Sequence, residues 1–186
     1  MGSQTDDLME KAVKHAMRIG ANFAETKGED TTTGQIEAVD NEIRKVSEVR
    51  NIGIGVRVFY GKGNGFSFSN ILDEENVLQA VETAMKIAKA ATKKTLVSMK
   101  LAEVKAVNDK KTTSVNKHPS EVSIDEKKDL CLRQCQTAMG YNKQIANTNS
   151  MFGEYYGTVS YINSEGTRVS YEPLLIGLTI TCVAKK

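Results

Sequence analysis

The feature that most constrains this chain is a strict alternation of residue types over residues 52–60. Apolar side chains occupy every second position: Ile52, Ile54, Val56, Val58 and Tyr60. Because successive side chains of a β-strand point to opposite faces of a sheet, this spacing predicts a strand with one buried face. Glycines cluster at residues 61–65, and apolar positions resume at Phe66 and Phe68. The stretch therefore reads as a hairpin whose turn lies within residues 61–65.

The same stretch does not satisfy the requirements of a phosphate-binding loop. A Walker loop needs Gly-Lys followed by Ser or Thr at a strand-to-helix junction, and here Lys62 is followed by Gly63. A dinucleotide fingerprint also leads into a helix, whereas Gly53 and Gly55 lie inside the predicted strand. Glycine within a strand usually marks a bulge or the close approach of another backbone. We therefore expect another chain to pass close to these two glycines.

The rest of the first half predicts helices at both ends of an antiparallel meander. A helical spacing of apolar residues begins after Asp6 and stops at Gly20, and Asp73 offers an N-cap for a second helix. Short strands with polar turns lie between them. The expected elements are a helix over 6–19, strands over 23–29 and 35–39 joined by a turn at 31–34, a hairpin at Asp40-Asn41, a strand over 43–49, and a helix over 73–91.

The second half is expected to begin with a mobile crossing segment, because residues 100–118 are polar, lysine-rich and weakly periodic. Ser123 and Glu126 have the spacing of a capping box, which predicts a helix that stops at Gly140. Alternating residues then indicate strands. These are expected over 145–152, 158–162, 168–171 and 174–183, with a turn at 163–166.

Together these elements predict an α+β fold in which an antiparallel meander packs two to three helices on one face. We expect residues 1–98 to form a helix-and-sheet core, 99–122 to cross over, and 123–186 to complete the domain with a helix and strands. The sequence stops two residues after an apolar strand ending at Ala184. That abrupt stop indicates part of a longer protein.

Charge and composition narrow the classes of partner. The net charge is +2, and no apolar run approaches the ~20 residues of a membrane-spanning helix. The first residues lack the pattern of a signal peptide, which favours a cytoplasmic location. Residues 86–128 hold eleven lysines against five acids, but no aromatic residue lies between Phe68 and Tyr141. Single-stranded nucleic acid is usually held by aromatic stacking in a basic groove, so a solvated lysine-rich face is the favoured interpretation.

No catalytic or metal-binding pattern stands out. His15 and His118 are far apart in sequence and belong to no paired zinc motif. Cys131 and Cys135 share a helix face and could bind a soft metal, but without further ligands nearby they are better explained as core thiols. No cysteine or serine is placed by a motif next to a base.

The order of several segments resembles the N-terminal domain of the TldD/PmbA family. The resemblance is carried by Ile19-Gly20-Ala21, Phe23-Ala24-Glu25, residues 43–47, Gly53-Ile54-Gly55-Val56-Arg57-Val58, Gly65-Phe66, Ser69-Asn70 and a small-residue helix through Ala84 and Ala88. Residues 161–166, Tyr-Ile-Asn-Ser-Glu-Gly, are similar to the family's second strand-turn signature.

This resemblance implies a cytoplasmic metalloprotease system for peptide maturation or degradation, also called a modulator of DNA gyrase. It implies a homodimer or a heterodimer with a related subunit. The family's zinc motif, His-Glu-x-x-x-His, is absent from this sequence. Zinc is therefore expected in a C-terminal catalytic domain that this chain lacks, and the chain alone is expected to be inactive. The positions that match the family pattern are Gly53, Gly55, Arg57, Gly65 and Asn70, with no catalytic role assigned.

Two functions remain open. The first is a non-catalytic substrate-cleft and assembly domain, in which an open sheet edge accepts an extended peptide by strand addition near Gly53 and Gly55. The second is a nucleic-acid or gyrase-associated binding module that uses the lysine-rich middle. The second predicts binding that weakens steeply as salt rises.

Overall fold

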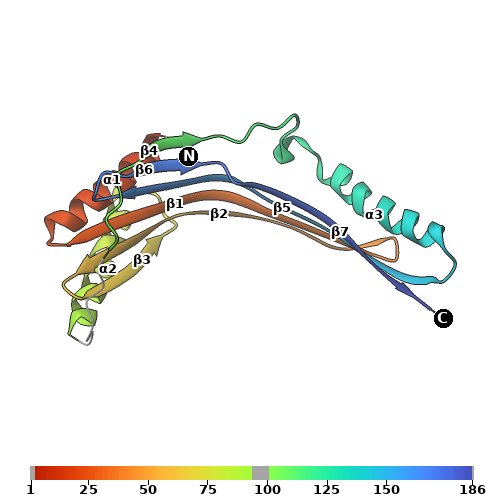
Figure 1. The fold of residues 1–186 in the computed structure, drawn as a ribbon, viewed down its shortest axis with the longest axis horizontal. Coiled ribbons are helices and arrows are strands. Elements are labelled where there is room, and N and C mark those ends of the chain that lie inside the picture. Colours follow the sequence, from red (N-terminus) through yellow and green to blue (C-terminus); the bar gives the residue numbers. More distant parts are fainter. Residues whose placement is uncertain (1–2, 94–100, 186) are drawn as a thin grey trace. The chain divides into compact units, whose positions relative to one another are not determined.

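The computed structural model describes residues 3–93 and 101–185. Three α-helices, one short 3-10 helix and seven strands follow one another along the described residues (Figure 1). In chain order they are α1 (Ser3–Arg18), β1 (Phe23–Val39), β2 (Glu42–Tyr60), β3 (Gly63–Ser69), α2 (Glu74–Thr92), β4 (Asn108–Lys111), η1 (Pro119–Glu121), α3 (Ile124–Tyr141), β5 (Ile145–Asn163), β6 (Arg168–Tyr171) and β7 (Leu174–Ala184).

The chain divides into two compact units, each assembled from three separate segments. Unit 1 comprises residues 1–30, 52–112 and 158–172, and unit 2 comprises residues 31–51, 113–157 and 173–186. Strands β1, β2 and β5 contribute residues to both units.

The sheet is mixed rather than purely antiparallel. Its strand order is β3-β2-β1-β5-β6-β4, and β7 pairs with β5 off this path. The pairs β2 with β3, β5 with β6 and β5 with β7 are antiparallel, whereas β4 runs parallel to β6. The α+β class predicted from the sequence is confirmed. The predicted meander is wrong in this one pair, because a parallel partner can be supplied only by a distant segment.

In unit 1, α1 and α2 pack on one face of the sheet (Figure 1). The predicted strand periodicity supplies that core: Ile54, Val56 and Val58 of β2 are buried against both helices. Asp73 caps α2 as expected, with its carboxylate accepting the backbone N–H of Asn76 at 2.7 Å. This cap holds the pKa of Asp73 below its usual value.

The turn predicted at residues 31–34 does not exist, because β1 runs through it without a break. Thr31 is buried, and threonine is well suited to strands. Gly34 also has a packing role instead of a turn role, since a Cβ there would lie 2.6 Å from Oε1 of Glu154. The turn was predicted because polar residues precede a glycine, and this pattern also occurs within a continuous strand.

Two further pairs of predicted strands are continuous. The strands expected over 43–49 and 52–60 form the single strand β2, and those expected over 145–152 and 158–162 form β5. Gly157 adopts φ of 144° within β5 without ending it. Backbone pairing with neighbouring strands overrides the local breaks in pattern.

The predicted hairpin connections are confirmed. Asp40 and Asn41 both have positive φ, at 49° and 65°, as a two-residue type I′ turn requires. The Asp40 carboxylate accepts the backbone N–H of Thr148 at 2.8 Å, and this bond holds its pKa below the usual value. The β2–β3 turn is narrower than predicted, because β3 already begins at Gly63. Gly166, with φ of 93°, completes the predicted turn between β5 and β6.

In unit 2, α3 covers a small core. The predicted capping box is present, with Ser123 and Glu126 bonding each other's backbone N–H groups. The predicted stop at Gly140 is wrong, because the helix continues to Tyr141. Cys131 and Cys135 face the core with Ile36, Ala38 and Phe152. The core-thiol interpretation of these cysteines is confirmed.

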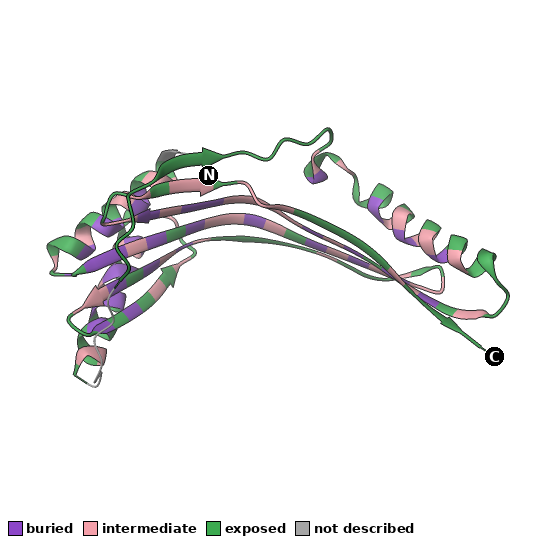
Figure 2. Cartoon of the chain, in the orientation of Figure 1, coloured by how far each residue is buried: buried purple, intermediate pink, exposed green. Residues whose placement is uncertain are grey.

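A buried ion pair also joins α3 to β5 in unit 2. Lys127 Nζ lies 2.6 Å from Glu154 Oε1, and both side chains are at most 5% exposed. By contrast, β7 is mostly exposed, as the green colouring of the strand shows (Figure 2). Leu175 and Ile176 are 66% and 54% exposed.

The crossing segment expected over 100–118 is partly ordered. Residues 94–100 lie outside the described residues, but β4 forms a four-residue strand against β6. All four β4 side chains are exposed, so backbone pairing rather than burial holds the strand in place. No described helix is long and apolar enough to cross a membrane.

Candidate functional site

The face of the unit 1 sheet opposite α1 and α2 gathers the polar and aromatic side chains of the candidate site. On β2, Ile54, Val56 and Val58 point to the helices, so Gly53, Gly55 and Arg57 point the other way. On the neighbouring strand β3, Phe68 lies opposite Gly55 and Phe66 lies opposite Arg57. We name this surface the open face and define it by these residues: Gly53, Gly55, Arg57, Phe66, Phe68, Glu25 and Tyr161.

Glu25 of β1 joins the polar residues of the open face. Its Oε1 lies 3.2 Å from Nη1 of Arg57, and its Oε2 accepts the hydroxyl of Tyr161 at 2.7 Å. Glu25 is about one-fifth exposed, whereas half of the Arg57 side chain is open to solvent. The carboxylate therefore fixes the position of the guanidinium and leaves some of its five donors available.

Tyr161 stays protonated in this arrangement. Burial, followed by its hydrogen bond to the Glu25 carboxylate, raises the pKa of Tyr161 to about 12. Asn163 Nδ2 lies 3.5 Å from the tyrosine oxygen on the same strand. The hydroxyl thus acts as a fixed donor that links β5 to β1, and it is not poised to act as a base.

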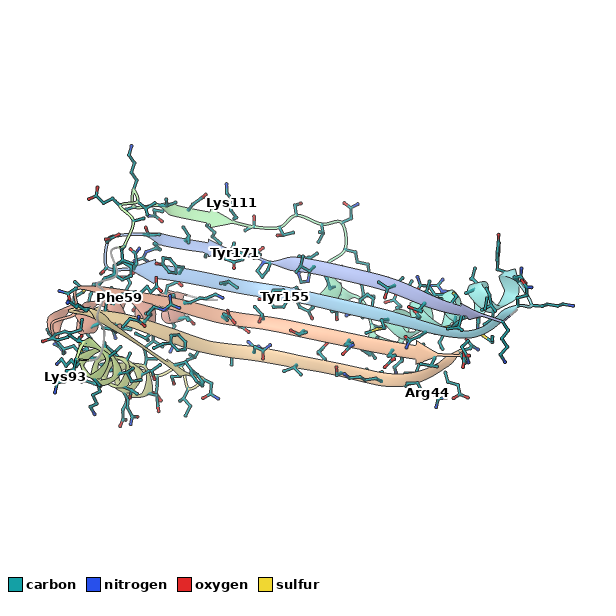
Figure 3. All side chains as sticks on the ribbon, turned by 60° about the horizontal axis from the view of Figure 1, so that its bottom comes forward. Arg44, Phe59, Lys93, Lys111, Tyr155 and Tyr171 are labelled. Carbon is teal, nitrogen blue, oxygen red and sulfur yellow. The ribbon has the colours of Figure 1, made fainter. Side chains whose placement is uncertain are left out.

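Phe66 and Phe68 add an exposed apolar patch to the open face. Phe66 is 53% exposed and Phe68 is 70% exposed. The Phe66 ring lies against Gly55, where an added Cβ would be 3.1 Å from the ring carbons. Phe59, labelled in Figure 3, stacks edge-on against Phe23 with ring centroids 5.6 Å apart. Exposed rings such as those of Phe66 and Phe68 are typical of surfaces that bind a partner.

The neighbour that approaches the two strand glycines is β3 of the same chain. A Cβ on Gly53 would lie 3.0 Å from the carbonyl oxygen of Ser69, and Gly55 faces the Phe66 ring. Strand β3 pairs with residues 54–60 of β2, so Gly55 lies between two paired strands, whereas Gly53 lies one residue beyond the β2–β3 pairing. Strand addition directly beside Gly55 is therefore blocked by β3, whereas strand addition beside Gly53 stays a prediction.

The other two predicted site residues, Gly65 and Asn70, do not lie on the open face. Gly65 lies on the helix side of β3, where a Cβ would collide with the carbonyl oxygen of Ala84 and lie 2.7 Å from the nitrogen of Ala88. Its role is to let α2 pack closely on β3. Asn70 follows β3 and is exposed.

Sequence reasoning missed Glu25, Tyr161, Phe66 and Phe68 as site residues. The polar residues lie in three separate stretches of the family pattern: Phe23-Ala24-Glu25, the strand that contains Arg57, and the turn signature that starts at Tyr161. These side chains come together because β1 pairs with both β2 and β5, which are separated along the chain by residues 61–144. The local sequence signal for these site residues was alternation: in each strand, the charged and aromatic residues occupy the positions that point away from the buried face.

The histidines and cysteines form no catalytic group. His15 Nε2 lies 2.7 Å from Glu82, whereas His118 caps η1 and stacks edge-on against Tyr156. Within residues 3–93 and 101–185, no group of three or more His, Cys, Asp and Glu side chains could hold a metal ion. The described histidines and cysteines therefore do not fit a zinc ion.

Comparison with known proteins connects the chain to a family. Residues 24–88 match the model of PmbA/TldA metallopeptidase domain 1, and residues 117–186 match that of the PmbA/TldA metallopeptidase central domain. The chain is 28% identical over 94% of its length to a metalloprotease of Methanocaldococcus jannaschii and 26% identical over 88% to metalloprotease PmbA of Escherichia coli O157:H7. It covers 38% and 37% of these two relatives.

Solved structures share the fold. A protein of Bacteroides thetaiotaomicron named as a candidate modulator of DNA gyrase has a TM-score of 0.81 at 14% identity, with 99% of this chain and 42% of that protein covered. TldE of Thermococcus kodakarensis has a TM-score of 0.63 at 19% identity, with coverages of 96% and 40%. Two models of one family thus match most of the chain, and the match to domain 1 precedes the match to the central domain. The chain belongs to the PmbA/TldD family of metallopeptidases.

Proposed function

We propose that this chain is the non-catalytic substrate-cleft and assembly part of a PmbA/TldD-type metalloprotease that processes or degrades peptides. Its proposed setting is the cytoplasm, in a dimer with an identical or related subunit. The zinc ion and the catalytic step belong, in this proposal, to a part of the protein outside the chain. The chain's family membership and its short coverage of the metalloprotease relatives support this division.

The observation that carries the proposal is the convergence of three family-like stretches on the open face. Glu25 of β1 contacts both Arg57 of β2 and Tyr161 of β5 there. Beside them, Phe66 and Phe68 offer apolar surface. An extended peptide laid across this face meets a fixed guanidinium for its carbonyl groups and aromatic rings for its side chains.

The direct test is fluorescence anisotropy with a labelled, unstructured peptide whose C-terminus is amidated. Phe68→Ser is expected to weaken binding about tenfold or more, since exposed aromatic anchors dominate such surfaces. The matched control is Val104→Ser, which removes an exposed apolar side chain of a non-strand segment. Binding that is absent, or that both variants weaken equally, contradicts the proposal.

The same measurement separates peptide binding from nucleic-acid binding. The second proposal would place DNA or RNA on the lysine-rich middle, and its affinity would fall steeply between low and moderate salt. Peptide binding through the open face is expected to change much less with salt. A labelled oligonucleotide that binds more tightly than the peptide at moderate salt would favour the second proposal.

A further inference from the structure

Unit 1 contains a cavity that the proposed function does not use. It has a volume of about 410 Å³ and lies between α1 and the turn that joins β5 to β6. That turn belongs to the signature segment over residues 161–166, which otherwise contributes only Tyr161 to the open face. The volume falls within the range of about 300–1,000 Å³ that is typical of small-ligand sites.

The wall of the cavity is held rigid by hydrogen bonds. Asn163 Oδ1 accepts the backbone N–H groups of Glu165 and Thr167 at 3.0 and 2.9 Å. Ser164 exchanges bonds with Ala24 of β1, through its backbone N–H at 2.8 Å and its hydroxyl at 3.1 Å. The cavity is therefore preformed, and a ligand would not have to order the turn.

The lining combines an apolar floor with a positively charged mouth. Val13, Met17 and Ile162 supply apolar surface. Glu10 interacts with both Lys14, at 3.4 Å, and Arg168. Two cations thus share one carboxylate, which leaves a formal charge of +1 at the mouth. Lys14 and Arg168 also keep donors that Glu10 does not use.

This lining favours one ligand chemistry. A carboxylate attached to an aliphatic group satisfies both the spare donors and the apolar floor. No aromatic side chain lines the cavity to stack a nucleobase, and a single carboxylate is too few ligands for a divalent cation.

We propose that the cavity binds the C-terminal end of a peptide. The terminal carboxylate contacts Lys14 and Arg168, and the last aliphatic side chain lies on Val13, Met17 and Ile162. This inference rests on the proposed function only in taking peptides as the ligands that reach the protein. It adds a second contact, which recognises a free peptide end and is separate from the open face.

The test is isothermal titration calorimetry of the chain with the acetylated peptide Gly-Ser-Gly-Leu carrying a free carboxylate. The same peptide as a C-terminal amide is expected to bind about tenfold more weakly, because it loses charge-assisted hydrogen bonds. The acid Gly-Ser-Gly-Gly should also bind more weakly, because it lacks the aliphatic side chain. Equal affinity for acid and amide overturns the inference.

Variants assign the binding to the cavity. Lys14→Gln alters a side chain that is 77% exposed, so the fold should persist, and it is expected to reduce the affinity for the acid to near that for the amide. Lys86→Gln makes the same change on the exposed side of α2 and should have no effect. Met17→Gln should weaken the Leu peptide and spare the Gly peptide. An effect of Lys86→Gln equal to that of Lys14→Gln overturns the site.

Competition with octanoate, an aliphatic acid that is not a peptide, tests whether the cavity recognises a peptide end or any aliphatic carboxylate. Weak or absent competition by octanoate supports a peptide end, whereas competition as strong as that of the peptide itself overturns that choice in favour of a general aliphatic acid. The amidated peptide used for the open face lacks the terminal carboxylate, so its expected affinity for this cavity is about tenfold lower than that of the acid. Loss of one binding event with retention of the other therefore shows which of the two proposals has failed.

Discussion

Gly55 and Gly65 belong to the same hairpin but meet different neighbours. A Cβ at Gly65 would collide with backbone atoms of α2, whereas a Cβ at Gly55 would touch the end of the Phe66 ring at 3.1 Å. A half-exposed ring can rotate away, but a helix backbone cannot do so without moving the whole element. Packing therefore requires glycine at position 65, whereas position 55 can accept a small side chain.

Gly65→Ala is expected to lower the free energy of unfolding by about 3 kcal/mol, as overpacking against a helix does. Gly55→Ala, the matched control, should change it by less than about 1 kcal/mol. Urea denaturation followed by circular dichroism measures both values. Equal losses for the two variants would contradict the packing role of Gly65.

Tyr161 makes the free energy of unfolding depend on pH in the alkaline range. Its pKa is about 12 in the folded protein and lies near 10 in the unfolded chain. The folded state therefore holds the proton more tightly, so this contribution is complete below pH 10 and is lost as the pH rises toward 12. Tyr161→Phe should reduce the decline in the free energy of unfolding between pH 10 and 12. An identical pH profile for the variant and the wild type would argue against this link.

At the scale of elements, α3 is attached to its sheet by few apolar groups and one buried ion pair. Lys127 and Glu154 contact each other, and Glu154 Oε2 has no hydrogen-bond partner among the described residues. A buried ion pair costs desolvation energy, so its presence is weak support for stability. Removing one partner is costly, because it strands the other charge.

Lys127→Met is expected to destabilise the protein by about 3–5 kcal/mol, since it leaves the Glu154 carboxylate buried and unpaired. Adding Glu154→Met should recover most of this loss, because two apolar side chains of similar length can share the site. Chemical denaturation of the two single variants and the double variant gives the coupling energy. A double variant no more stable than the worse single variant would contradict this explanation.

At the scale of the whole molecule, the segments that match the two family models do not correspond to the two compact units. Residues 24–88 supply strands to both units, and so do residues 117–186. In unit 1, β1 bonds to β5 through contacts such as the hydroxyl of Tyr161 with Glu25. Neither half of the chain can complete either unit by itself.

Residues 1–112 alone are therefore expected to lack a cooperative thermal transition, because β1 would lose its β5 partner. Mixing them in equal amount with residues 113–186 should restore the transition and the circular dichroism of the intact chain, which serves as the reference. A cooperative transition in the 1–112 fragment by itself would show that β5 is not needed for folding.

The sequence by itself determined the elements whose signals are local. The α2 and α3 caps, the Asp40-Asn41 turn and the buried face of β2 depend on residues within a few positions of one another. The α+β class follows from these elements. For the same reason Gly53, Gly55 and Arg57 could be assigned to one side of a strand before any partner was known.

Only the tertiary structure decided the continuity of β1, β2 and β5, the parallel β4 and β6 pair, and the composition of the open face. Each depends on hydrogen bonds or contacts between segments distant in sequence, and no local pattern records which strands become neighbours. The separation of Gly65 from the other candidate residues has the same cause. Alternation shows that side chains point to two faces, but the packing of α2 on β3 decides which face is covered.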